Sequence, residues 1–172
     1  MALRTRYKAD IDLIAAMWKL DPLLVEAVVV QESGGNTDAF RFEPDFWNRY
    51  LKSNPRYRGL NPRRVSSSYG LMQVMYCRIL EDKIADNDAW EPELLFIPKN
   101  GLDIGCGLLA QLLQWAKALT TDPTLATTAA LAAYNGGKGG NRPGIDTPLR
   151  NGKYAREVLA KLAILTSEYS AA

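Results

Sequence analysis

The sequence contains no histidine. Without an imidazole, the Ser-His-Asp and Cys-His mechanisms are excluded, and an imidazole-based zinc site is not expected. Carboxylates therefore remain as the natural acid and base groups. Cysteine is nearly absent as well. Cys77 and Cys106 lack a metal-ligand spacing, and we expect two small buried apolar residues, with a disulfide as the alternative. We expect no metal and no cofactor.

Long hydrophobic runs are also missing. The apolar stretches are much shorter than the roughly eighteen residues that a membrane span needs. Residues 1–8 are basic but lead into an amphipathic, charge-bearing segment, which is not typical of a signal peptide. We therefore expect a protein made in the cytoplasm, without a membrane segment, that reaches any external destination by another route.

Net charge is small, at +2 from 21 basic and 19 acidic residues. This balance does not require nucleic acid as a partner, and we expect none. The basic residues are nevertheless clustered in one segment with aromatic residues among them: Arg49, Lys52, Arg56, Arg58, Arg63 and Arg64, with Trp47, Tyr50 and Tyr57. Two interpretations stay open, a solvated face or a surface that binds a polyanion, either nucleic acid or an anionic cell-wall polymer.

The chain is mainly helical by its apolar spacing. Its 172 residues, 47% of them hydrophobic, fit a single compact domain over 1–172. The spacing predicts helices over residues 10–20, 22–33, 103–119, 124–134 and 154–169, and no run alternates as a strand does. Residues 35–68 contain three prolines and are predicted to form an extended excursion that shapes a cleft wall, with one amphipathic helix over 44–51.

Two of these helices have clear start signals. An Asp-Pro pair occurs at Asp21 and again at Asp122, and such an Asp caps free amides while the proline suits the first helical position. Asp10 is a weaker cap for the first helix. Gly34 and Gly35 end the second helix. Glycines at 101, 105 and 107 weaken the start of the 103–119 helix and permit close packing of another helix.

Glu32 lies near the end of the 22–33 helix. It follows Val25, Val28 and Val29 by seven, four and three residues, so it continues the apolar stripe. A carboxyl group held against valines would keep its proton to higher pH, because desolvation disfavours the charged form, and would be a general acid. The alternative is a Glu32 that turns into water and has no role.

Two further stretches carry polar groups among apolar or glycine residues. Residues 66–75 predict a turn at the serines that leads into a short buried extended piece, in which the Gln73 amide either ties backbone together or binds a ligand. Residues 134–141 form a glycine-rich loop. A phosphate-binding loop is set aside, because the required order of glycines, lysine and serine or threonine is missing.

Four pieces of the chain follow one another in a characteristic order: Glu32-Ser33-Gly34-Gly35-Asn36, Gly70-Leu71-Met72-Gln73-Val74-Met75, Ala132-Ala133-Tyr134-Asn135-Gly136-Gly137 and Tyr154-Ala155-Arg156-Glu157-Val158-Leu159. This set resembles the soluble lytic transglycosylase family, lysozyme-like enzymes that cleave the glycan strands of peptidoglycan. The resemblance covers nearly the whole chain. It implies a mainly α, lysozyme-like fold with a substrate cleft, at most a very small β element, and a monomer acting on peptidoglycan.

The resemblance also implies roles for individual residues. Glu32 matches the single catalytic acid and base, and Ser33 matches the residue that supports the end of its helix. The positions that match substrate-binding residues are Met72, Gln73, Tyr134, Asn135 and Tyr154. A serine that contacts the N-acetyl group is expected just before the second motif, where Ser66, Ser67 and Ser68 compete, and we favour Ser68. The family usually has a shorter connection than residues 35–68 between the first two motifs, which leaves the subsites on that side open.

The implied chemistry needs one carboxylate. Glu32 would protonate the oxygen between N-acetylmuramic acid and N-acetylglucosamine, then take a proton from the muramoyl C6 hydroxyl, which closes on C1 to give a 1,6-anhydro product. Two alternatives stay open. One is a goose-type muramidase that uses water and a second carboxylate, such as Asp38, Glu43 or Asp45. The other is a non-catalytic glycan-binding or assembly component. For delivery we favour a phage enzyme released through a holin, or a virion-associated one.

Overall fold

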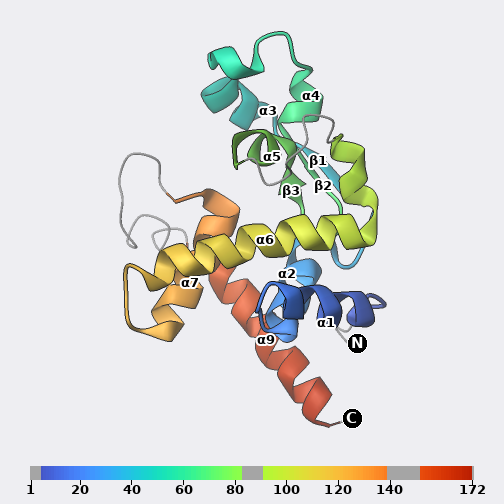
Figure 1. Cartoon of the computed structure of the whole chain (residues 1–172), viewed down its shortest axis with the longest axis vertical. Coiled ribbons are helices and arrows are strands. Elements are labelled where there is room, and N and C mark those ends of the chain that lie inside the picture. The colour runs from blue at the N-terminus through green and yellow to red at the C-terminus, as the bar shows by residue number, and fades with distance from the viewer. Residues whose placement is uncertain (1–4, 83–90, 139–151, 172) are drawn as a thin grey trace. The chain divides into compact units, whose positions relative to one another are not determined.

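The computed structural model describes residues 5–82, 91–138 and 152–171 (Figure 1). The chain forms two compact units. The first unit consists of Met1–Gln31 and Cys106–Ala172, and the second of Glu32–Gly105. A single domain over 1–172 stays a prediction, and the predicted excursion over 35–68 belongs to the second unit.

The first unit is helical in its described part. It contains α1 (Lys8–Met17), most of α2 (Pro22–Ser33), the second half of α6 (Pro98–Lys117), α7 (Pro123–Gly136) and α9 (Lys153–Ser170). Figure 1 shows α7 beside α9, and the two helices are in contact. Its core joins α6 to α7 through leucines and small side chains: Leu108, Leu112, Ala116, Ala126, Ala129, Ala130 and Ala133. The alanines allow this close approach because they add almost no bulk between the helices.

The predicted helix starts are confirmed at both Asp-Pro pairs. Asp21 Oδ1 accepts from the Leu23 amide at 2.9 Å, and Asp122 Oδ1 accepts from the Thr124 and Leu125 amides at 2.8 and 3.1 Å. α2 ends where Gly34 and Gly35 take φ of 60° and 80°, a conformation that costs other residues strain.

The boundaries of α1, α6 and α7 differ from the prediction. α1 begins at Lys8, so Asp10 lies in its first turn and is not its cap. α6 begins at Pro98 instead of 103, because proline suits a first helical position, and it ends at Lys117, which leaves Leu119 outside the helix and 44% exposed. α7 continues to Gly136, so Tyr134 and Asn135 lie in its last turn and not in a loop. The end of the predicted glycine-rich loop, from residue 139, lies outside the described residues.

Glycines of α6 make close contacts, as predicted, but mostly not with another helix. A Cβ added at Gly105 would lie 2.4 Å from Met72 Sδ, in the turn before β3. A Cβ added at Gly107 would lie 3.0 Å from the Trp18 ring, at the end of α1. The glycines therefore leave room for two large side chains.

The second unit is built on a small antiparallel sheet in the order β1-β2-β3. Its strands are β1 (Phe40–Phe42), β2 (Ser67–Tyr69) and β3 (Val74–Met75), and β2 pairs Ser68 with both Arg41 and Met75. Short helical pieces surround the sheet: α3 (Pro44–Phe46), the π-helical turn η1 (Trp47–Leu51), the 3-10 turns η2 (Pro55–Tyr57) and η3 (Pro92–Phe96), α4 (Pro62–Val65) and α5 (Tyr76–Asp82). Leu51, Tyr57, Val65 and Cys77 form one buried hydrophobic cluster of this unit.

The serines of residues 66–75 do not form the predicted turn. Ser67 and Ser68 lie in β2, and the chain turns over residues 70–73, where Gly70 and Gln73 have φ of 70° and 47°. Pairing with β1, more than twenty residues away, holds the serines extended. The predicted helix over 44–51 is present as α3 followed by η1. Cys77 and Cys106 are buried and not disulfide-bonded, so the buried-apolar interpretation is confirmed.

One buried acid was not anticipated from the sequence. Glu26 lies on α2, is 1% exposed, and accepts hydrogen bonds from the Thr5 amide at 2.6 Å and from the Tyr169 hydroxyl at 2.9 Å. Its carboxylate therefore joins the N-terminal segment and the last turns of α9 to α2 inside the first unit.

Replacing Glu26 with alanine is expected to destabilise the first unit by about 3 kcal/mol, because two buried donors lose a charged acceptor. Tyr169→Phe removes one of these bonds and is expected to cost about 1.5 kcal/mol. Thermal unfolding of both variants and of the double variant measures the coupling. Additive losses would contradict the shared hydrogen bond, because residues in one network lose less together than separately.

Candidate functional site

Glu32 lies in the last turn of α2 and is half-buried. Val25, Val28 and Val29, which precede it on the same helix, are completely buried. The side chain therefore continues the apolar stripe of α2 and is itself partly removed from water. A carboxyl group in such a position is accessible to a ligand and can exchange a proton with it.

Ser33 connects the end of this helix to the turn of the second unit. Its Oγ donates to the Leu71 carbonyl oxygen at 2.8 Å and accepts from the Gly35 amide at 3.2 Å. The first bond spans 38 residues of sequence, so it joins the helix end to the segment that bears Gln73. The Ser33 hydroxyl therefore bonds to backbone on both sides, and its role as support for the catalytic residue stays a prediction.

Gln73 uses its amide nitrogen inside the protein. Nε2 donates to the Ala39 carbonyl oxygen at 2.9 Å and to the Gly70 carbonyl oxygen at 3.0 Å, and the residue is 9% exposed. Of the two interpretations of this glutamine, the one in which it ties backbone together is confirmed. A ligand would therefore contact the side-chain carbonyl oxygen of Gln73, which can accept a hydrogen bond.

The three competing serines are all buried but differ in their hydrogen bonds. Ser66 Oγ donates to the Glu43 carbonyl oxygen at 2.7 Å, and Ser67 Oγ donates to the Arg63 carbonyl oxygen. The Ser68 hydroxyl has no such bond to another described residue. Met72 is completely buried and packs at Gly105.

Two tyrosines beside these residues are structural donors. Burial raises the pKa of Tyr69 to about 12, and its hydroxyl donates to the Arg64 carbonyl oxygen at 2.8 Å. Burial and a hydrogen bond to Glu81 also raise the pKa of Tyr57. Both phenols are therefore neutral at neutral pH and hold the backbone and side chains around the sheet.

The first unit contains a polar cavity of about 470 Å³ at the start of α9. It brings together two of the predicted residues, Asn135 from the last turn of α7 and Tyr154 from the first turn of α9. The other lining residues are Gln31, Gly152, Lys153, Arg156 and Glu157. The predicted Tyr134 instead packs against the core between α6 and α7.

Sequence reasoning missed Gln31 and its partners on α9. Gln31 Nε2 donates to Glu157 Oε2 at 3.0 Å, and Lys161 Nζ donates to Gln31 Oε1 at 2.7 Å. The only signal in the sequence is the four-residue spacing of Glu157 and Lys161, which places both on one face of a helix. Nothing local indicates that their partner is more than 120 residues away.

The predicted residues thus form two groups. Ser33, Ser68, Met72 and Gln73 lie with Glu32 in the second unit, whereas Tyr134, Asn135 and Tyr154 lie in the first. Within residues 5–82, 91–138 and 152–171, no three cysteine, aspartate or glutamate side chains are placed to hold a metal ion. Across the same residues, no helix combines the length and the apolar character that crossing a membrane requires.

Comparison with known proteins identifies the family. Residues 11–158 match the family described as the transglycosylase SLT domain. Among solved structures, the chain is similar to the lytic transglycosylase Slt of Pseudomonas aeruginosa, determined by X-ray crystallography as an inactive mutant, with a TM-score of 0.62 and 18% sequence identity. The similarity covers 96% of this chain but 25% of that one, so this chain spans about a quarter of that protein's length.

This structural likeness confirms the predicted mainly α, lysozyme-like fold with a small β element. The comparison with curated proteins finds no match. The family match includes Glu32 and every other residue predicted to bind substrate. Because it covers well over half of the sequence, the chain belongs to the transglycosylase SLT domain family, as its four ordered motifs predicted.

Proposed function

We propose that this protein is a peptidoglycan lytic transglycosylase. It cleaves the β-1,4 bond between N-acetylmuramic acid and N-acetylglucosamine and forms a 1,6-anhydromuramoyl product. The observation that carries the proposal is the family match over residues 11–158, which includes a glutamate at the end of a buried helix. A half-buried carboxyl group in a chain without histidine is a suitable acid and base.

In the proposed mechanism Glu32 acts twice. As an acid it donates its proton to the glycosidic oxygen, so that the N-acetylglucosamine leaves as an alcohol while the N-acetyl carbonyl of the substrate stabilises the cationic sugar. As a base it then accepts the proton of the C6 hydroxyl, whose oxygen bonds to C1. The nucleophile belongs to the same sugar, so its effective concentration is very high. No second carboxylate is needed to orient a water molecule, in contrast to an ordinary glycosidase.

Four of the other predicted residues supply polar groups for the sugar. Asn135 and Tyr154 line the cavity at the start of α9, where an amide and a hydroxyl suit the hydroxyl and amide groups of a glycan. In the second unit, the carbonyl oxygen of Gln73 and the hydroxyl of Ser68 are assigned to the substrate. Ser33 holds the helix end that bears Glu32 through its bond to Leu71. For the route by which the protein reaches the wall, we propose release through a holin or delivery by a virion.

Digestion of purified sacculi tests this function. Mass spectrometry of the released muropeptides is expected to show anhydro ends, which are lighter by one water than reducing ends. Reducing ends would instead support the goose-type muramidase. Sacculi that bind the protein but release no fragments would support a non-catalytic glycan-binding component.

A pair of serine variants tests the assignment of Ser68. Ser68→Ala is expected to raise KM for sacculus fragments about tenfold, the loss of one hydrogen bond to substrate, with little change in Tm. Ser66→Ala is the matched control. It removes the hydroxyl that bonds to the Glu43 carbonyl, so it is expected to lower stability by about 1 kcal/mol and to leave KM unchanged. The reverse pattern, with KM raised only by Ser66→Ala, would reassign the sugar contact.

A further inference from the structure

The charges of this protein are unevenly distributed along the chain. Residues 46–80 contain no acidic side chain and seven basic ones: Arg49, Lys52, Arg56, Arg58, Arg63, Arg64 and Arg78. The rest of the chain holds the other 14 basic residues and all 19 acidic ones, which gives it a net charge of −5. The net positive charge of the whole protein therefore comes from residues 46–80 of the second unit.

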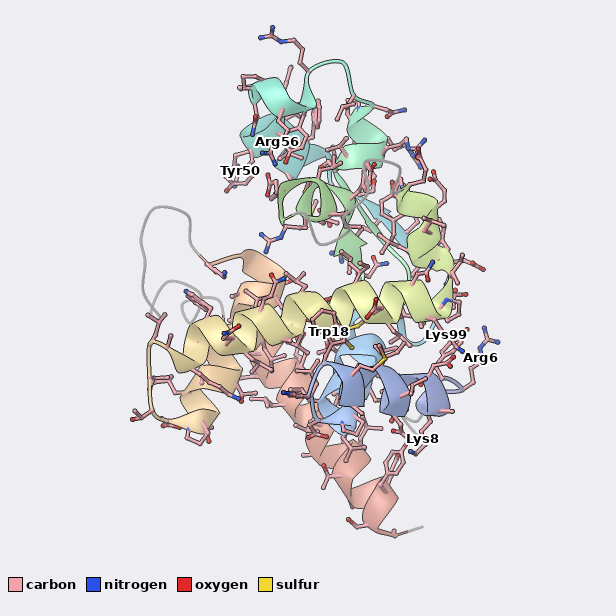
Figure 2. All side chains as sticks on the ribbon, viewed as in Figure 1. Arg6, Lys8, Trp18, Tyr50, Arg56 and Lys99 are labelled. Atoms are coloured by element: carbon pink, nitrogen blue, oxygen red, sulfur yellow. The ribbon has the colours of Figure 1, made fainter. Side chains whose placement is uncertain are left out.

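Five of these residues are exposed and form what we call the basic surface: Arg49, Lys52, Arg56, Arg58 and Arg63. They lie on or beside η1, η2 and α4, and Figure 2 labels Arg56 in this region. None of the five makes an ion pair with an acidic residue in the described part of the chain. Arg64 differs, because it pairs with Glu91 and Glu93. The basic surface thus carries charge that no ion pair among the described residues of the second unit neutralises.

Several of these guanidinium groups are held in place by neighbouring groups. Arg63 lies 5.3 Å from the ring centroid of Phe40, and Arg49 lies 5.9 Å from that of Tyr50. Arg56 Nη1 donates to the Leu80 carbonyl oxygen at 3.0 Å. Such contacts already restrict the side chains before a ligand binds. Binding therefore costs less conformational entropy than it would for fully mobile side chains. Tyr50, labelled in Figure 2, is 58% exposed and adds a flat apolar face.

We propose that the basic surface binds the phosphate groups of an anionic polymer attached to the cell wall, of the poly(glycerol phosphate) type, and thereby holds the protein on its substrate. Guanidinium groups match phosphate oxygens in two-pronged hydrogen bonds. The cations lie on short helical pieces and on the segments that connect them, which suits a flexible chain with a phosphate in each repeat. Reading duplex DNA typically places an α-helix or a two-stranded ribbon in a groove, whereas these residues lie on or beside helical pieces of only three to five residues.

Binding of the full-length Glu32→Gln protein to poly(glycerol phosphate) and to purified walls tests this inference. The walls are used intact and after hydrofluoric acid, which cleaves the phosphodiester polymer from peptidoglycan. A triple variant, Arg49→Glu, Lys52→Glu and Arg58→Glu, is compared with the matched control Lys19→Glu, Lys99→Glu and Lys117→Glu. The control residues are exposed and lie outside the basic surface, so both variants change net charge equally.

The basic-surface variant is expected to lose at least about tenfold in affinity for the polymer and for intact walls, and the control less than about threefold. Binding by the Glu32→Gln protein itself should fall steeply with added salt and on stripped walls. If the triple glutamate variant does not fold by circular dichroism, the corresponding triple glutamine variant replaces it. Equal losses in both variants, or equal binding to intact and stripped walls, would overturn the proposal.

Two further probes decide between polyanions. Tighter binding to duplex DNA or to anionic phospholipid vesicles than to poly(glycerol phosphate) would also overturn the proposal and would assign the surface to nucleic acid or to membrane. All measurements use a protein that lacks the proposed catalytic acid. Failure of the proposed cleavage reaction would therefore leave the binding result intact, and the two can be told apart.

Discussion

The Glu32→Gln variant is expected to release soluble muropeptides from sacculi at least about 10²–10⁴-fold more slowly than the unaltered protein. Glutamine nearly preserves the size of the side chain, but it can neither donate a proton to the glycosidic oxygen nor accept one from the C6 hydroxyl. The initial rate of turbidity loss of a sacculus suspension, followed at equal protein concentration, measures the effect. The variant is expected to keep its Tm within about 2 °C, because Glu32 lies half-buried at a helix end.

Three carboxylates of the second unit provide the controls for this prediction. Asp38 and Asp45 are exposed, and Glu43 is paired with Arg41. Asp38→Asn, Glu43→Gln and Asp45→Asn are each expected to retain activity, because the proposed mechanism uses one carboxylate. A loss in any of them as large as that of Glu32→Gln would point to a second catalytic carboxylate and to the muramidase. An unchanged rate in the Glu32→Gln variant would remove Glu32 from the mechanism.

Gly70→Ala is expected to destabilise the second unit by about 3 kcal/mol or more and to lower Tm by about 10 °C. Gly70 has a φ of 70°, and a Cβ added there would lie 2.1 Å from the Leu95 carbonyl oxygen. A backbone atom cannot move aside as a flexible side chain does, so the turn over residues 70–73 must shift. The Gly70 carbonyl accepts from Gln73 Nε2, and activity is therefore expected to fall together with stability.

Gly34→Ala is the matched control, because it separates backbone strain from the clash. Gly34 has a similar φ of 60°, but no atom lies within 4 Å of an added Cβ. This variant is expected to lose only about 1 kcal/mol, the strain of a left-handed conformation in alanine. Thermal unfolding by circular dichroism compares the two variants. Equal changes in Tm would mean that the contact with Leu95 is relieved cheaply and that only the strain at φ of 70° matters.

Local signals were sufficient for the helices that carry most of the predicted site. The start of α2 at Asp21 and Pro22, its end at the glycines and the spacing from Val25 to Glu32 are all read within sixteen residues. The same holds for the start of α7, where Asp122 bonds to amides two and three residues ahead. A cap and its helix are neighbours in sequence, so their interaction does not depend on the rest of the fold.

Contacts between distant segments were not predictable in this way. Three adjacent serines suggest a turn, yet pairing with β1 makes two of them a strand, because backbone hydrogen bonds to a partner outweigh a weak local preference. Glu26 looks like an ordinary polar position on a helix. Its burial depends on a tyrosine 143 residues away. The hydroxyl of this tyrosine donates a hydrogen bond to the carboxylate and so replaces one that water would otherwise donate.

The sequence by itself determined the family, the position of Glu32 at the end of a helix and the absence of imidazole chemistry, since motif order, caps and composition are properties of the chain alone. Only the tertiary structure decided which polar groups are already used. It commits the Gln73 amide nitrogen to two backbone carbonyls, joins Gln31 to α9 and gives five cations of the second unit no ion pair with an acidic residue that the structure describes. The reason is physical: a hydrogen bond or an ion pair needs its partner within a few ångströms, and folding alone sets which residues come that close.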